Sequence, residues 1–111
     1  MKIRYLLSLL LLLPGLAVAA PASEAQLAAI ARMGELNGIA LECRFVDQVR
    51  RIKQELIARL PKQRELGAWF EEKTNASFTA FMSEGRTCPA LSDFERDLDA
   101  AVQQLDEAFP R

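Results

Sequence analysis

The chain has 111 residues, enough for one domain, and its 14 basic and 15 acidic residues give a formal net charge of −1 at pH 7. This balance argues against a general nucleic-acid-binding protein, which needs a strong basic excess. The sequence contains no histidine, which excludes catalytic arrangements that use an imidazole as the general base.

The N-terminal segment has the features of a secretory signal peptide. Lys2 and Arg4 precede an apolar stretch at 5–13, and the small residues 17–19 follow it. This order predicts a signal peptide at 1–19 that is removed by cleavage after Ala19, leaving a single helical domain at 20–111. The apolar stretch is shorter than the ~20 residues that span a bilayer, which argues against a membrane anchor. We therefore expect an exported protein, periplasmic or secreted, with no membrane span after cleavage.

The residues after position 19 favour helices and show no sustained alternation of the kind that marks strands. Ser23 and Gln26 have the spacing of a capping box, which predicts that the first helix begins near Ser23. Asn37-Gly38 favours a turn and predicts that this helix ends or bends there. If the helix instead continues, Gly34 and Gly38 form a small groove in which another helix can approach closely.

A second helix is predicted from about Gly38 to Leu60, because apolar residues recur there at steps of three and four. Glu42 falls within the apolar face of this helix and is a possible buried charge. A buried carboxylate needs an ion-pair partner, or it can serve as a pH sensor, and both interpretations of Glu42 remain open.

Two further helices complete the predicted fold. Pro61 stops the second helix and opens a third, which runs to about Glu84 and is terminated by Gly85. Ser92 and Glu95 have capping-box spacing and predict the start of the last helix. The sequence therefore predicts an all-α fold, a small antiparallel helical bundle with three long helices and a shorter N-terminal helix.

The chain contains two cysteines, Cys43 and Cys88. In an exported protein an even number of cysteines predicts disulfide pairing, and two cysteines allow one intramolecular bond. This bond would tie the early part of the second helix to the connection before the last helix. An intermolecular disulfide or a reactive thiol is the alternative, although no CxxC pattern supports redox chemistry.

The predicted third helix carries an unusually wide apolar face. Leu66, Phe70 and Phe81 define its centre, with Trp69 on one flank and with Phe78 and Met82 on the other. The apolar arc is about twice the ~100° that a helix needs to cover one core. Either this helix lies between two others, or Trp69, Phe78 and Met82 are exposed and bind a protein partner.

Charges are distributed unevenly along the chain. Without residues 1–19, 12 basic residues remain against 15 acidic ones, so the net charge becomes about −3. Basic residues dominate the predicted second helix, and acidic residues dominate the last one. Either these helices are neighbours whose charges face each other, or the surface is bipolar and steers a charged partner.

The sequence contains no glycine-rich phosphate loop and no haem-attachment motif, and it predicts no metal site, no cofactor and no enzymatic activity. We expect a non-enzymatic binding module that docks on a protein partner as an adaptor or inhibitor. A periplasmic stress chaperone is the first alternative, because protonation of its many carboxylates at low pH would leave a strong positive charge. A structural subunit of an envelope complex is the second.

Overall fold

The structure, a computed structural model, describes residues 21–111. These residues form four helices and no strand: α2 (Glu24–Glu42), α3 (Val46–Arg59), α4 (Arg64–Ser83) and α5 (Leu91–Ala108). A disulfide joins Cys43 to Cys88. The predicted all-α fold and disulfide are therefore confirmed, while the predicted signal peptide lies outside the described residues. None of the four helices has a stretch both long and apolar enough to cross a membrane.

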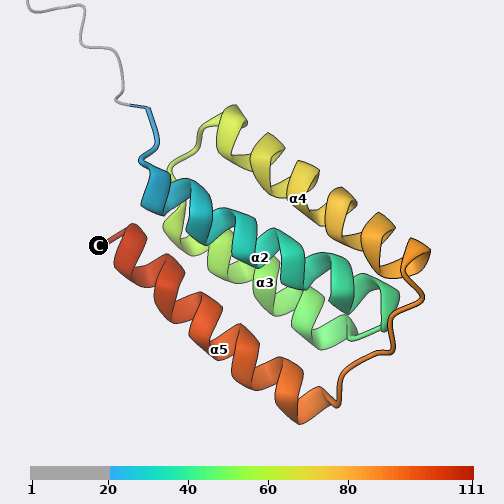
Figure 1. Ribbon diagram of the computed structural model, residues 1–111. Helices are drawn as coiled ribbons and strands as arrows, with labels where there is room; N and C mark the ends of the chain where they lie inside the picture. Colours follow the sequence, from blue (N-terminus) through green and yellow to red (C-terminus); the bar gives the residue numbers. More distant parts are fainter. Residues whose placement is uncertain (1–20) are drawn as a thin grey trace, which may run out of the picture.

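Helix α2 is the central helix, and it packs against each of the other three (Figure 1). Its partner in closest contact is α4, which runs parallel to it: Trp69 Nε1 donates to the carbonyl of Leu27, 2.9 Å away, near the start of both helices. Helix α5 runs antiparallel to α2, since Gln26 near the start of α2 donates to the carbonyl of Ala108. Consecutive helices thus run in opposite directions, as their short connections predict.

The hydrophobic core is formed by one face of each helix. Ile30, Met33 and Leu36 of α2 are buried at its centre, and Ile52 and Leu56 of α3 cover them. Ala29 and Ala40 of α2 also belong to the core. The other core side chains come from α4, α5 and the residue after α5: Leu66, Phe70, Phe94, Leu98, Ala101, Leu105 and Phe109.

Helix α2 begins as predicted, with a capping box. Ser23 Oγ accepts from the Gln26 backbone amide at 3.1 Å, and Gln26 Oε1 accepts from the Ser23 amide at 3.0 Å. Each side chain satisfies a backbone donor that the first turn of a helix leaves free.

The predicted break at Asn37-Gly38 is wrong, because α2 continues to Glu42. A Cβ atom on Gly38 would lie 2.7 Å from the backbone nitrogen of Phe78, so α4 lies directly against this glycine. Asn37 Nδ2 donates to Thr74 Oγ1 across the same contact, at 3.2 Å. Tertiary packing therefore overrides the turn preference of this dipeptide, and the alternative of a continuous helix that α4 approaches closely is the correct one.

The chain turns instead at Cys43–Phe45, where Arg44 has a φ of 60°. The second helix consequently begins at Val46 rather than near Gly38, and it is the shortest of the four, with 14 residues. Leu41, Glu42 and Cys43 belong to the end of α2, not to the second helix.

The ends of α4 and α5 differ from the sequence prediction at two places. Helix α4 begins at Arg64, with Gln63 as its N-cap, so Pro61 does not open it. Gly85, with a φ of 62°, follows the last turn of α4 as predicted. Helix α5, however, starts at Leu91 with Ala90 as its N-cap and no side-chain cap. The predicted Ser92–Glu95 capping box is therefore absent, because Ser92 already lies inside the helix.

Basic side chains of α3 face acidic side chains of α5. Arg51 pairs with Asp99 at 2.8 Å, and Arg59 Nε pairs with Asp106 at 3.0 Å. The uneven charge distribution is thus explained, at these positions, by two neighbouring helices whose charges pair.

Candidate functional site

Trp69, one of the three predicted partner-binding residues, is used within the fold. Its indole nitrogen donates to Leu27 of α2, and its ring packs against the core. Lys73 Nζ lies 4.2 Å from the ring centroid, a cation–π distance. The polar atom and one face of Trp69 are therefore engaged by other parts of the same chain.

Phe78 and Met82 lie one turn apart on α4, more than two turns beyond Trp69. Phe78 is half-buried, while the Met82 side chain is 53% exposed. Glu42 is half-buried at the last residue of α2, and none of the ion pairs within residues 21–111 includes it. The structure thus brings Phe78 and Met82 together and separates Trp69 from them.

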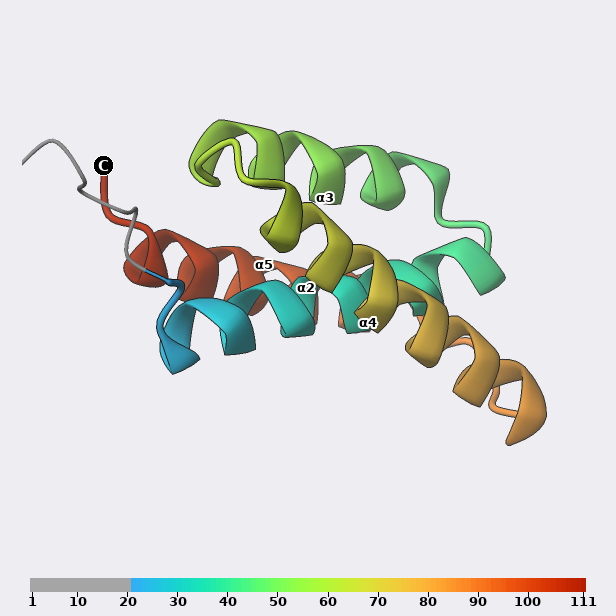
Figure 2. The same cartoon turned by 90° about the horizontal axis from the view of Figure 1, so that it is seen from above.

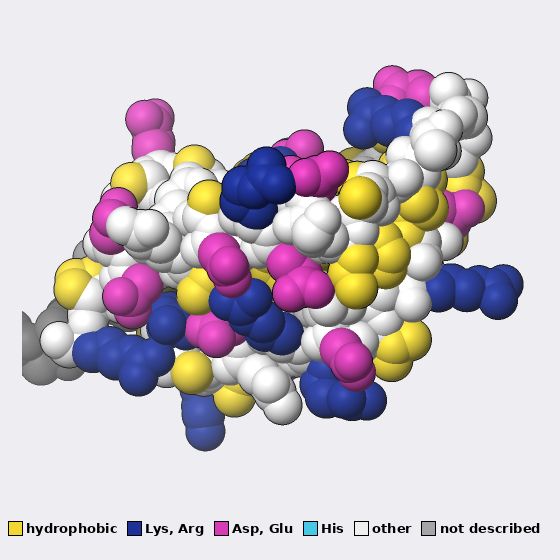
Figure 3. Space-filling model, turned by 90° about the horizontal axis from the view of Figure 1, so that it is seen from below, with side chains coloured by type: hydrophobic (Ala, Val, Ile, Leu, Met, Phe, Trp, Pro, Cys, Tyr) yellow, Lys and Arg dark blue, Asp and Glu magenta, His cyan; other side chains and the backbone are white. Residues whose placement is uncertain are grey.

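Met82 belongs to a group of exposed apolar side chains at one end of the bundle. Each helix contributes one of them, at its last but one residue or at its first residue, and the group is called the apolar end below. Its members are Leu41 (44% exposed), Val46 (62%), Met82 (53%) and Leu91 (44%). Figure 3 shows apolar side chains gathering toward the right-hand end of the molecule, where α5 begins. The Cys43–Cys88 disulfide lies at the same end.

Ion pairs between residues close in sequence surround the apolar end. Arg50 pairs with Asp47 in the first turns of α3, and Arg96 pairs with Asp93 at the start of α5. Arg86 pairs with Glu84 directly after α4. An apolar centre with a charged rim is the arrangement found in protein–protein interfaces.

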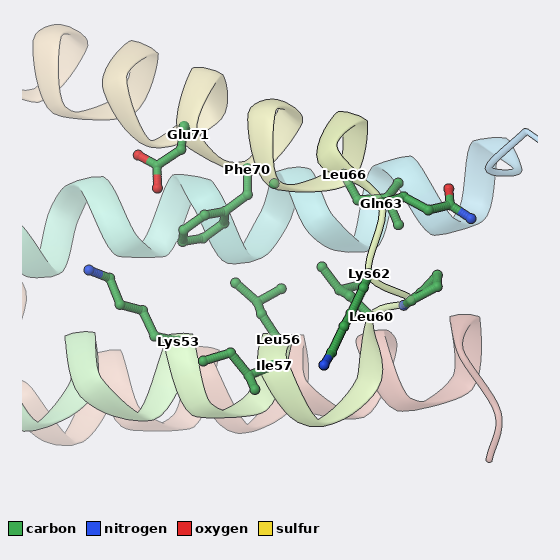
Figure 4. A pocket seen from close by; sticks show the side chains of 11 residues that line it. Lys53, Leu56, Ile57, Leu60, Lys62, Gln63, Leu66, Phe70 and Glu71 are labelled. Atoms are coloured by element: carbon green, nitrogen blue, oxygen red, sulfur yellow. The ribbon is translucent and has the colours of Figure 1, made fainter.

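A second surface feature is the α3–α4 groove, of about 510 Å³, which lies between helices that make no close backbone contact. Viewed from above, α3 ends and α4 begins at a common turn, and the two helices diverge away from it (Figure 2). Leu56, Leu66 and Phe70, which belong to the core, form the apolar floor of the groove (Figure 4). Ile57, 81% exposed, stands on its α3 wall, and Gly67 leaves space on its α4 wall.

Sequence reasoning found one residue of the apolar end, Met82, and missed the α3–α4 groove. It predicted an antiparallel bundle joined by short connections, in which the second and third helices would be neighbours. Helix α3 instead packs on α2 and α5, and α4 packs on α2, which leaves the groove open. The one usable sequence signal was Gly67, a glycine in the interior of an otherwise strong helix, where it costs stability unless space is needed.

Among residues 21–111, no three His, Cys, Asp or Glu side chains lie close enough together to hold a metal ion. Comparisons of the chain with known protein families, with curated proteins and with solved structures find no match.

Proposed function

We propose that this protein is a non-enzymatic, exported binding module that docks on a protein partner through the apolar end. The observation that carries the proposal is the gathering of four exposed apolar side chains, one from each helix, inside a rim of ion pairs. Exposed apolar groups scattered singly need no explanation, whereas several gathered at one end of a small protein support an interaction surface.

The framework behind the apolar end is rigid. The disulfide fixes the end of α2 to the connection that leads into α5, and hydrogen bonds close the ends of α2 and α4. A surface that is already in its binding conformation loses little conformational entropy when a partner docks. We expect Met82 and Leu41 to be the main contacts with the partner. The unbranched side chain of Met82 can adapt to the surface of the partner.

We place the protein in the periplasm or the extracellular space. The Cys43–Cys88 disulfide supports this placement, since such bonds persist in oxidising compartments. The apparent signal peptide of the sequence agrees with it.

The proposal is tested by immobilising the oxidised protein, expressed as the full chain, and passing the native envelope extract of the source cells over it at about pH 7. We expect one partner to be retained in stoichiometric amount. Leu41→Asp and Met82→Asp should each abolish retention, because a charge would be buried in the interface. Ile57→Asp is the control, since it places the same charge on an exposed apolar residue outside the apolar end. Equal retention by all three variants would refute the docking surface.

The stress-chaperone alternative has its own structural support. Helix α3 is held against α5 partly by the pairs of Arg51 and Arg59 with Asp99 and Asp106, and protonation of these aspartates in acid would remove both pairs. Movement of α3 would then expose the core residues beneath it. Passing the same extract over the immobilised protein near pH 3 distinguishes a binding module from a chaperone. A chaperone would retain many unrelated proteins near pH 3 and none at about pH 7.

A further inference from the structure

The α3–α4 groove has the size and lining of a ligand site. Its volume of about 510 Å³ lies within the range of roughly 300–1,000 Å³ that is usual for small-molecule sites. Residues of the turn from α3 to α4 line one end, and apolar side chains form the floor (Figure 4).

The polar groups of the groove lie at its edges. Lys53 and Glu71 stand on opposite walls at one end, whereas Lys62 stands near the closing turn, away from Glu71 (Figure 4). Among residues 21–111, no carboxylate forms an ion pair with either lysine. An unpaired ammonium group above an apolar floor attracts a molecule that has both an anionic group and a hydrocarbon part.

We propose that the α3–α4 groove binds a single-chain amphiphile with an anionic head group, such as a fatty acid, with the acyl chain on the floor and the head beside Lys62. The chain would lie on the nearly buried Leu56, Leu66 and Phe70. It would cover the exposed side chain of Ile57 and the accessible part of Leu60, and so remove apolar surface from water. Lys62 selects the anionic head because its charge is not balanced by Glu71. This site is separate from the apolar end and does not depend on a protein partner.

Gly67 provides a direct test, because a Cβ atom built on it meets no other atom within 4 Å. Phenylalanine at this position therefore enters the groove without disturbing the fold. The experiment is a titration of the oxidised full-chain protein with dodecanoate, kept below its micelle concentration and at a pH where it is ionised, followed by calorimetry and by the shifts of backbone amide resonances. We expect saturable binding with one site, and the shifts should be centred on the groove.

The variants decide between specific and unspecific binding. Gly67→Phe should weaken the affinity for dodecanoate at least about tenfold, while Ala68→Phe, on an exposed position outside the groove lining, should leave it unchanged. Lys62→Ala should weaken it up to about fivefold, the range of a solvent-exposed ion pair. Decanoate should bind more weakly, by up to about fourfold for each methylene removed. Full affinity in Gly67→Phe, or the absence of saturable binding, would overturn the proposal.

The charge of the head group is tested separately with dodecyltrimethylammonium, which has the same chain and the opposite charge. We expect it to bind more weakly than dodecanoate to the wild-type protein, and the difference should shrink in Lys62→Ala. Equal affinity of the wild-type protein for the two amphiphiles would overturn the assignment of Lys62 to an anionic head.

Discussion

Arg44 and Gly85 occupy equivalent positions at the ends of the parallel helices α2 and α4. Each has a positive φ, 60° for Arg44 and 62° for Gly85. At both ends, the amide of the next residue donates back five positions, from Phe45 to Ala40 and from Arg86 to Phe81. This is the Schellman arrangement, in which a left-handed residue allows the last helical carbonyls to be satisfied. Glycine adopts this conformation freely, whereas arginine has a Cβ atom and does so at a cost.

Replacing Arg44 by glycine should therefore stabilise the protein. We expect Arg44→Gly to raise the free energy of unfolding by about 1 kcal/mol, measured by urea denaturation with the fluorescence of Trp69 as the signal. Gly85→Ala is the mirror control: its side chain has open space, so it should lower stability by a similar amount through the backbone alone. If Arg44→Gly lowers stability, the arginine side chain makes a contribution that outweighs its backbone strain.

Two glycines in helix interiors should respond in opposite ways to the same substitution. Gly38→Ala would place a Cβ atom 2.7 Å from backbone atoms of α4, so we expect a loss of about 1–3 kcal/mol from overpacking. Gly67→Ala meets no atom within 4 Å and should gain about 0.5–1 kcal/mol from helix propensity. Thermal unfolding followed by circular dichroism compares the two variants directly. Similar effects of both substitutions would contradict the close packing of α2 on α4.

These glycines also show where sequence reasoning reached its limit. The helical content, the Ser23 cap, the Gly85 terminator and the disulfide followed from local patterns, because each depends on residues near in sequence or on chemistry alone. The continuation of α2 through Asn37-Gly38 depends on Thr74 and Phe78, which are about 40 positions away. No local rule contains that contact. The turn preference of Asn37-Gly38 was therefore the strongest signal in the local sequence, and the prediction that followed from it was wrong.

Most of the candidate surfaces escaped prediction for the same reason. Met82 was among the residues predicted to bind a partner, but Leu41 fits an apolar stripe as well as any core residue. Only the arrangement of the helix ends shows that Leu41 remains exposed. Trp69 is the opposite case: the sequence suggested an exposed, partner-binding side chain. In the structure its indole nitrogen instead donates to the carbonyl of Leu27 within the same chain.

Arg59 should be the ion-pairing residue that matters most for stability. Its side chain is only 12% exposed and bonds to Asp106 and to Glu55. Burial alone would lower the pKa of Arg59, but the hydrogen bonds to Asp106 and Glu55 and the charges of both carboxylates outweigh it, so its pKa is raised. We expect Arg59→Met to cost about 1–2 kcal/mol. Arg50→Met, which removes an exposed pair with Asp47, should change stability little.

The raised pKa of Arg59 determines how the stability lost in Arg59→Met depends on pH. A basic group whose pKa is higher in the folded than in the unfolded protein contributes its full stabilisation below the unfolded value, and loses it only as the pH rises through the folded value. The cost of Arg59→Met should therefore be constant between roughly pH 6 and pH 10 in urea denaturation. A cost that disappears within this range would mean that a different group controls the interaction.

Removal of the disulfide should affect the apolar end more than the contact between α2 and α4. Cys43 and Cys88 are 45 positions apart, and closing a loop of this length contributes roughly 4 kcal/mol in the chain-entropy model. Cys43→Ala/Cys88→Ala should lose about this much stability. Amide hydrogen exchange should then increase most around Val46 and Leu91, because the disulfide holds their helix ends together. The packing of Gly34 and Gly38 against α4 involves no cysteine, so protection there should fall only with global stability. Uniform loss of protection would show that the disulfide stabilises the whole bundle and does not specifically order the apolar end.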